Sequence, residues 1–289
     1  MKNVLAVGHC TLDHIGLVEK LAKHDEEVDI RTYSIQGGGT AATAAVALAR
    51  WGVDTQFVGK VGDDARGKQI VHTLRDEGVD TSAVVCQSGA ISQARHVIAE
   101  RNGTMRTAYS TPGTVTPLSA DEVDATVVDE ADLVVVDGWC SGAKSELLDR
   151  ANKRGVPVIL EADHGRKVEG KSVHHADVVV ASEREASAYT GVGDLEGICA
   201  AFLEKGPHTA IVTLGDEGAV AMSREEDYVR LEAPAVEVVD TTGAGDVFLA
   251  AIAWGYLQGW PLERLIEEAN RAAAHACLGP GGRSSIIEW

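Results

Sequence analysis

The chain has 289 residues, of which 45% are hydrophobic and 24% charged, and its formal net charge is −18. This composition supports a sizeable buried core, and no stretch reaches the roughly 18 to 20 consecutive apolar residues of a membrane span. The negative charge argues against nucleic acid or an anionic membrane as a partner. The N-terminus enters a strand directly, without the pattern of an export signal, which predicts a cytoplasmic protein. Five widely spaced cysteines without a Cys-x-x-Cys pair predict reduced thiols rather than disulfides or a zinc site.

Short β-rich apolar runs alternate with amphipathic segments along most of the chain. This alternation predicts an α/β fold, in which a mainly parallel central sheet is covered by helices on both faces. The predicted strands are 4–7, 55–58, 133–136, 158–160, 178–180, 210–213 and 219–222, and the clearest helices are 64–77, 144–153 and 195–204.

Two segments interrupt this rhythm, at about 10–36 and 84–110. Both are strand-like without a helix between them, and the second contains Asn-Gly at 102–103, which is typical of a tight hairpin turn. We expect these segments to form a small sheet that projects from the main domain as a cover. No linker or repeat is visible, so residues 1–289 are interpreted as one domain with this appendage.

The first predicted strand is followed by Gly-His-Cys-Thr-Leu-Asp at 8–13. Loops at the carboxyl ends of parallel strands face the ligand crevice of an α/β sheet, and the Asp13 carboxylate there could accept protons from two hydroxyl groups. An aspartate in a surface turn is the alternative. Three glycines at 37–39 then precede a predicted helix that runs through Arg50. Such glycines let a ligand approach the backbone closely, although helix packing alone could explain them.

The most informative stretch is Val-Val-Asp-Thr-Thr-Gly-Ala-Gly-Asp-Val-Phe at 238–248. It is interpreted as an apolar strand, a turn of minimal side chains and a helix through about Leu257. The uncovered amides of Gly243, Ala244 and Gly245 at a helix start would form an anion site that could stabilise a transferring phosphoryl group. Asp246 beside them could accept a proton from an attacking hydroxyl. A glycine turn followed by a helix-capping aspartate is the alternative.

Residues 240–248 resemble the C-terminal signature of the ribokinase-like, or PfkB, carbohydrate kinases, and the resemblance extends over essentially the whole chain. It implies a three-layer, Rossmann-like ribokinase fold with a small β-sheet lid, and transfer of the ATP γ-phosphate to a sugar hydroxyl. In this resemblance Asp246 is the catalytic base, and Gly243, Ala244 and Gly245 form the anion hole. The chain lacks the G-x-x-x-x-G-K-[ST] motif of P-loop kinases and a dinucleotide-binding G-x-G-x-x-G after the first strand.

The same resemblance assigns the sugar to the N-terminal elements. Their residues are Thr11, Asp13, Gly38, Gly39, Thr40 and Thr43. Thr43 stands where the family usually has asparagine, and Thr40 where ribokinases have lysine, so ribose specificity does not follow from the motif.

The resemblance also assigns a nucleotide site and metal sites. Glu185 would organise Mg²⁺ through water, in an element where Ser182 replaces the usual asparagine. The tail at 278–285 resembles a loop that binds K⁺ in ribokinases, and Asp240 would take part in any such monovalent site. The implied nucleotide-binding residues are Ser182, Thr213, Gly215, Gly218 and Asn270, and Arg166 could meet an ATP phosphate.

Within the family, the sequences of the motifs at 37–43 and 280–284 most resemble those of sulfofructose kinases and, more distantly, of ketohexokinases. A free, ketose-like monosaccharide is therefore the leading acceptor. A sugar phosphate is the alternative, and Arg31, Arg95 or Arg106 could then supply cations. A sugar- or nucleotide-binding regulator without turnover is a further alternative. Relatives often pair through their lids, so a homodimer through the lid is expected.

Overall fold

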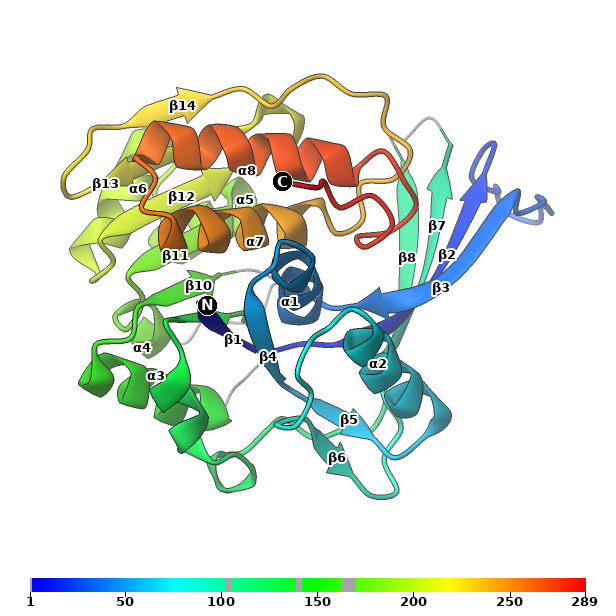
Figure 1. Cartoon of the computed structure of the whole chain (residues 1–289). Helices are drawn as coiled ribbons and strands as arrows, with labels where there is room; N and C mark the ends of the chain where they lie inside the picture. Colours follow the sequence, from blue (N-terminus) through cyan, green and yellow to red (C-terminus); the bar gives the residue numbers. More distant parts are fainter. Residues whose placement is uncertain (1, 102–104, 139–141, 163–169) are drawn as a thin grey trace.

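The computed structural model describes residues 2–101, 105–138, 142–162 and 170–289 (Figure 1). The expected hairpin turn at 102–103 and Arg166 lie outside these residues. Among the described helices, none is long and apolar enough to cross a membrane.

The centre of the protein is an eight-stranded sheet (Figure 1). Its strands follow the order β14 (Val229–Leu231), β13 (Ala219–Ser223), β12 (Thr209–Thr213), β11 (Val178–Ser182), β10 (Val158–Glu161), β9 (Leu133–Val136), β1 (Asn3–Val7) and β4 (Asp54–Val58). The pairs from β4 to β12 are parallel, whereas β13 and β14 are antiparallel to their neighbours. This architecture confirms the predicted α/β class.

The sheet is buried on both faces by helices. On one face lie α1 (Thr40–Arg50), α7 (Ala244–Leu257) and α8 (Leu262–Ala276), and on the other α3 (Gly142–Arg154), α5 (Glu183–Thr190) and α6 (Leu195–Glu204). The strand β9 shows the consequence, because all four of its residues are buried, with Val135 in one core and Val134 in the other. Parallel strands covered on both faces are continuously apolar for this reason.

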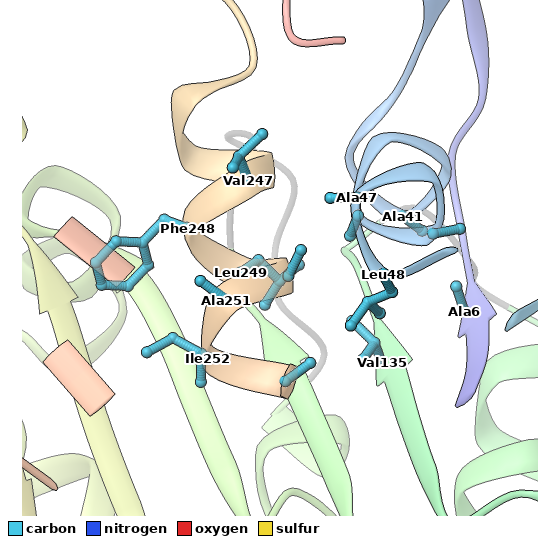
Figure 2. Packing of buried hydrophobic residues seen from close by; sticks show 14 of the residues in the cluster. Ala6, Ala41, Ala47, Leu48, Val135, Val247, Phe248, Leu249, Ala251 and Ile252 are labelled. Carbon is cyan, nitrogen blue, oxygen red and sulfur yellow. The ribbon is translucent and has the colours of Figure 1, made fainter. Parts of the chain in front are cut away.

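Helices α1 and α7 pack side by side over the centre of the sheet (Figure 2). The labelled side chain of α1 that faces α7 is small, that of Ala47, while α7 contributes Leu249 on its side of the contact. Alanine side chains let two helix axes approach closely because little volume separates the backbones. The first turns of the two helices, each preceded by a glycine, therefore lie near each other.

A second sheet of four strands stands to one side of the main sheet (Figure 1). Its order is β3 (Thr32–Gly38), β2 (Thr11–Val18), β7 (Ala94–Glu100) and β8 (Arg106–Thr111). Val85–Gln87 forms β6, which pairs with β5 (Lys60–Gly62) instead of joining this sheet. The four-stranded sheet thus uses only part of the segment 84–110.

Side-chain alternation gives the small sheet an inner and an outer face. Asp13 is in register with Arg95, and Leu17 with Ala99, which is in turn opposite Arg106. Asp13, Arg95 and Arg106 therefore share one face, and the Arg106 side chain donates a hydrogen bond to Thr242 of the main domain at 3.0 Å. We call this the inner face.

One local prediction was wrong. Residues 238–239 form no strand, and the segment from 232 to 239 crosses from β14 to α7 without regular structure. The amide of Val239 donates to the carbonyl of Cys277 at the end of α8 (2.8 Å), so its hydrogen bond is made to a helix end rather than to a sheet.

The C-terminal tail is held by aromatic packing. Trp289 stacks on Trp254 with ring centroids 4.9 Å apart, and the indole N–H of Trp51 donates to the carbonyl of Ile287 at 2.7 Å. Tryptophan buries a large area while its N–H finds a partner. The loop from 278 to 286 is thereby fixed between α8 and α1.

A buried lysine ties the root of the small sheet to the main domain. Lys60 of β5 donates to the Glu122 carboxylate at 2.6 Å and to Thr116 at 2.9 Å, in the segment that follows β8. The hydrogen bond from Lys60, together with the Ser119 amide, lowers the pKa of Glu122 to about 2. The ionised carboxylate is therefore the form that stabilises the fold.

We expect Glu122→Gln to lower the melting temperature by a few degrees at pH 7, because the charge-assisted hydrogen bonds to Lys60 are lost. A depressed carboxyl pKa stabilises fully above the unfolded value of about 4.5 and loses its effect as the pH falls towards 2. Calorimetry between pH 7 and pH 2 should show that the difference in melting temperature between variant and wild type becomes smaller as the pH falls. The exposed neighbour Asp121→Asn is the control, and a gap that stays constant with pH would contradict the assignment.

Candidate active site

The first group of the site is the carboxylate of Asp13, at the start of the small sheet. Asp13 is only 3% exposed, and the Thr11 hydroxyl donates to it at 2.6 Å. A Cβ on Gly38 would lie 2.3 Å from an oxygen of this carboxylate. The predicted residues Thr11, Asp13 and Gly38 are thus brought together, and glycine at position 38 is required by the close approach.

The second group is the glycine-rich start of α1. Gly39 has a φ of 94°, and a Cβ there would lie 2.4 Å from the carbonyl oxygen of His9. The helix has no side-chain cap from Gly39 itself. In the first turn, the amide of Ala41 donates to the carboxylate of Asp137 at 3.1 Å.

Asp137 is a residue that sequence analysis missed. It follows β9, is fully buried, and also accepts the amide of His9 at 2.8 Å. One carboxylate therefore joins the loop after β1 to the N-terminus of α1, where the helix dipole favours a negative charge. Its position directly after a strand buried on both faces was the available signal.

Thr40 and Thr43 lie in the first turn of α1, and both are buried. The Thr43 hydroxyl accepts a long hydrogen bond of 3.4 Å from the guanidinium of Arg283. The threonine that replaces the usual asparagine thus faces a cation from the C-terminal loop.

The third group is the start of α7. Gly243 is the N-cap residue with a φ of 80°, and no side chain caps the helix. A Cβ on Gly245 would meet no atom within 4 Å, so space remains above the first turn. Exposed amides at the positive end of a helix are suited to phosphate oxygens. Asp246 lies in this same first turn and is half-buried.

Asp240, just before this turn, holds the C-terminal loop against it. Its carboxylate accepts the amide and hydroxyl of Thr242 at 3.0 and 2.8 Å and the amide of Gly281 at 2.8 Å. Gly282 touches Gly243 so closely that a Cβ on Gly243 would lie 2.2 Å from its Cα. These three hydrogen bonds hold the buried Asp240 carboxylate between the start of α7 and the C-terminal loop.

A cavity of about 600 Å³ opens beside the start of α7. It is bordered by Ala244 and Gly245 of the predicted anion site and by four of the predicted nucleotide-binding residues, Thr213, Gly215, Gly218 and Asn270. Much of its wall is apolar, with contributions from Pro234, Ala235, Val236, Val238, Phe248, Ala273, Ala274 and Cys277. Asp216 is the one charged residue that borders it in the described part of the chain.

Two of the predicted nucleotide-site residues have clear structural partners. The Asn270 amide group donates to the carbonyl of Leu231 at 3.0 Å, so it links α8 to β14. Ser182 does not border the cavity; it is the N-cap of α5, accepting the amide of Glu185 at 3.4 Å and donating to the Glu185 carboxylate. Ser182 therefore orients Glu185.

The described residues contain no cluster of three or more histidine, cysteine or acidic side chains that could enclose a metal ion. Glu185 is the predicted magnesium residue, and its side chain is 11% exposed in the first turn of α5, directly after β11. Magnesium is commonly bound by one or two carboxylates together with water and substrate phosphates. The donor set at Glu185 fits that mode of binding.

Cysteine chemistry is disfavoured at the site. Burial raises the pKa of the Cys10 thiol to about 12, so Cys10 is neutral and unreactive at pH 7. The other described cysteines, Cys86, Cys199 and Cys277, are also free thiols.

Arg283 is the other residue that sequence analysis did not place in the site. Its side chain passes beneath the glycine loop, is 5% exposed, and donates to Thr43 and to the carbonyl of Gly38, both at 3.4 Å. Burial lowers its pKa to about 10, while the nearby carboxylates of Asp13, Glu77 and Asp246 oppose that shift. Asp13 and Asp246 are thus both within the electrostatic reach of one guanidinium.

Comparisons with known proteins agree with this arrangement. The model of the pfkB family carbohydrate kinases matches residues 1–289. The chain is 29% identical over 288 residues to the ribokinase of Bacillus subtilis, covering 99% of this chain and 96% of that protein. It is 29% identical over 289 residues to the ATP-dependent ribose-1-phosphate kinase of Halopiger xanaduensis, covering 99% and 95%. The structure of Arabidopsis thaliana ribokinase complexed with ribose and ATP matches with a TM-score of 0.83 and 27% identity, covering 99% of this chain and 96% of that one.

Proposed function

The chain belongs to the pfkB family of carbohydrate kinases and is an ATP-dependent sugar kinase, and we propose that Asp246 is the general base that activates the acceptor hydroxyl. The observation that carries this proposal is the uncapped start of α7, which borders the 600 Å³ cavity and bears the Asp246 carboxylate. Bare amides and a carboxylate in one helical turn are what phosphoryl transfer to an alcohol requires.

ATP occupies the cavity beside α7 in this proposal. The apolar wall from Val236 to Cys277 suits the adenine ring, and Gly215 and Gly218 leave room along the nucleotide. The γ-phosphate then reaches the amides of Ala244 and Gly245. No cation of the described residues borders the cavity, so these amides and a metal ion must offset the phosphate charge.

The sugar lies between Asp13 and Asp246. Asp13 accepts hydrogen bonds from hydroxyl groups and orients the acceptor, with Gly38 and Gly39 giving it access to backbone. Asp246 takes the proton of the attacking hydroxyl as its oxygen forms a bond to the γ-phosphorus and the bond to the ADP oxygen breaks. Such base assistance contributes ~10²–10⁴-fold, and positioning and electrostatics supply the remainder.

Glu185, oriented by Ser182, would hold Mg²⁺ through water at the phosphates. When bound, the metal neutralises charge on the phosphate oxygens. A monovalent ion would use Asp240 and the carbonyls of the loop at 278–285. Its support is the proximity of Gly281 to the Asp240 carboxylate, at 2.8 Å.

The small sheet serves as a lid that excludes water during transfer. The contact of Arg106 with Thr242 supports this role, because Thr242 directly precedes the anion site. Exclusion of water limits hydrolysis of ATP and strengthens the electrostatic interactions within the site.

We expect Asp246→Asn to lower kcat by about 10²–10⁴-fold with little change in sugar affinity, because the amide cannot accept the proton. Coupled detection of ADP gives kcat, and calorimetry gives the sugar Kd. The exposed Asp227→Asn removes the same charge elsewhere and should leave both unchanged. Near-normal turnover in Asp246→Asn would refute the base assignment. Wild-type protein that melts at higher temperature with ligands but releases no ADP would instead indicate a regulator.

The acceptor we propose is a free, ketose-like monosaccharide. Asp13 and the glycine loop supply hydrogen-bond acceptors and backbone access, which suit neutral hydroxyl groups. A sugar phosphate is the second candidate. It is favoured by Arg95 and Arg106, which share the inner face of the lid with Asp13. Arg31 instead borders a separate cavity with Leu17 and Pro280.

A panel of free and phosphorylated pentoses and hexoses, assayed with ATP and Mg²⁺, separates these candidates. We expect a free sugar to have the highest kcat/KM, and Arg95→Gln to change that value by less than about tenfold. If the acceptor is a sugar phosphate, Arg95→Gln should instead weaken its binding by about 1.5–3 kcal/mol, which lowers kcat/KM by more than tenfold. Strong preference for phosphorylated sugars, abolished by Arg95→Gln but not by Arg101→Gln, would overturn the choice of a free sugar.

We also propose that two copies of the chain pair through the outer faces of their lids. One row across the outer face contains Ile35, His14, His96 and Tyr109, in which the two histidine rings stack at 4.7 Å. Tyr109 is 66% exposed and Ile35 43%. Large exposed apolar side chains on one face of a sheet are typical of an interaction surface.

If this surface pairs two copies, Tyr109→Asp should convert a dimer to a monomer, because it buries a charge in the interface. Light scattering after size-exclusion chromatography measures the mass. Ile91→Asp, at an exposed position outside the row, should remain dimeric. A monomeric wild-type protein at working concentration would exclude the pairing.

A further inference from the structure

The guanidinium of Arg283 is buried without a full set of partners. Only two of its nitrogens make hydrogen bonds, both 3.4 Å long, to Thr43 and to the carbonyl of Gly38. The third nitrogen, Nη1, has no partner among the described residues. Burying a cation is costly unless nearby charges and hydrogen bonds offset the loss of water. Packing alone therefore does not explain why an arginine occupies this buried position.

Arg283 accounts for the first glycine of the loop. A Cβ on Gly37 would lie 2.1 Å from Nη1, so no side chain fits between this strand and the guanidinium. Gly38 is required by Asp13, and Gly39 by the carbonyl of His9. The three glycines thus have three different neighbours, and Gly37 serves the arginine rather than a ligand.

Charged groups from several elements face Arg283. Asp13 comes from β2, Asp246 from α7, and Glu77 from the C-terminal end of α2 (Ala65–Asp76), where it pairs with Arg50 of α1. The thiol of Cys10 also lies nearby and is neutral. Two of these carboxylates are those between which the acceptor is placed.

We propose that Arg283 is a positioning residue for phosphoryl transfer, which holds the sugar loop against the start of α7 and supplies a buried positive charge that favours the ionised form of Asp246. The inference rests on the proposed roles of those two aspartates. Its basis is that one guanidinium contacts the sugar loop directly while its own backbone follows Gly282, which packs on Gly243.

The charge matters most when the site is closed. Two carboxylates that face one small sugar repel each other, and loss of water makes that repulsion stronger. A fixed cation near both offsets the repulsion, so Asp246 can be ionised and act as a base at neutral pH. Arginine suits the position because its planar fork reaches Thr43 and Gly38 simultaneously.

The test is the pH dependence of kcat for Arg283→Met, Arg283→Lys and Arg50→Met. Arg50 donates to the backbone carbonyl of Arg283 at 2.7 Å, so Arg50→Met removes a support of the loop but keeps the buried charge. We expect Arg283→Met to lower kcat at pH 7 by roughly tenfold or more, with the acidic limb of the profile moved up by roughly one pH unit. Arg283→Lys should lower kcat but keep the acidic limb of the pH profile close to that of wild type. Arg50→Met should leave the acidic limb unchanged.

Circular dichroism melts establish which variants are folded. If Arg283→Met does not fold, the test rests on Arg283→Lys alone. An acidic limb of its kcat profile that is displaced by as much as one pH unit would contradict a role of the positive charge. A folded Arg283→Met whose profile superimposes on that of wild type would overturn the inference. Parallel assay of Asp246→Asn separates the two proposals, because high activity in that variant refutes the base itself, whereas an inactive Asp246→Asn with an unchanged Arg283→Met profile refutes only the role of Arg283.

Discussion

The uncapped start of α7 is the constraint on which the site depends. Helices α1 and α7 both begin after a glycine with positive φ, close together above the same sheet. In the first turn of α1 the amide of Ala41 donates to the buried carboxylate of Asp137 and that of Ala42 to the carbonyl of His9. At the start of α7 the amide of Ala244 donates a long hydrogen bond to the carbonyl of Thr241 (3.3 Å), but no side chain caps the helix and open space lies over Gly245. The free donors of a helix start require a partner, and in the proposed mechanism the phosphate of the ligand is that partner at α7.

The C-terminal loop brings the two halves of the site together. Asp240 binds the Gly281 amide, Gly282 rests against Gly243, and Gln36 of β3 accepts the amide of Arg283 at 3.1 Å. The loop thus touches the start of α7 on one side and the edge of the lid on the other. Aromatic packing of Trp289 on Trp254 keeps its far end in place. A small number of short-range contacts therefore sets the distance between the glycine loop at 37–39 and the start of α7.

The lid is linked to the chemistry through its inner face. Arg106 reaches Thr242, which donates to Asp240, which in turn accepts from Gly281. Movement of the lid would change the first of these hydrogen bonds, and the change would be felt next to the anion site. The arrangement gives a physical route by which closure over a sugar and formation of the phosphate site can be coupled.

Sequence patterns were sufficient to predict the α/β architecture, the small sheet, the glycine turns and the position of Asp246, because strand alternation, helix periodicity and turn residues act over a few neighbouring positions. They failed at 238–239, where an apolar pair lies beside a helix end instead of in a strand. Asp137 was placed in the site only by tertiary structure, as were the contact with Thr242 of Arg106, which the sequence offered only as a cation for a sugar phosphate, and the position of Arg283. Their hydrogen bonds to Ala41, Thr242 and Thr43 join residues 96, 136 and 240 positions apart. No local pattern encodes such pairs, since they arise when packed layers bring distant loops to one edge of the sheet.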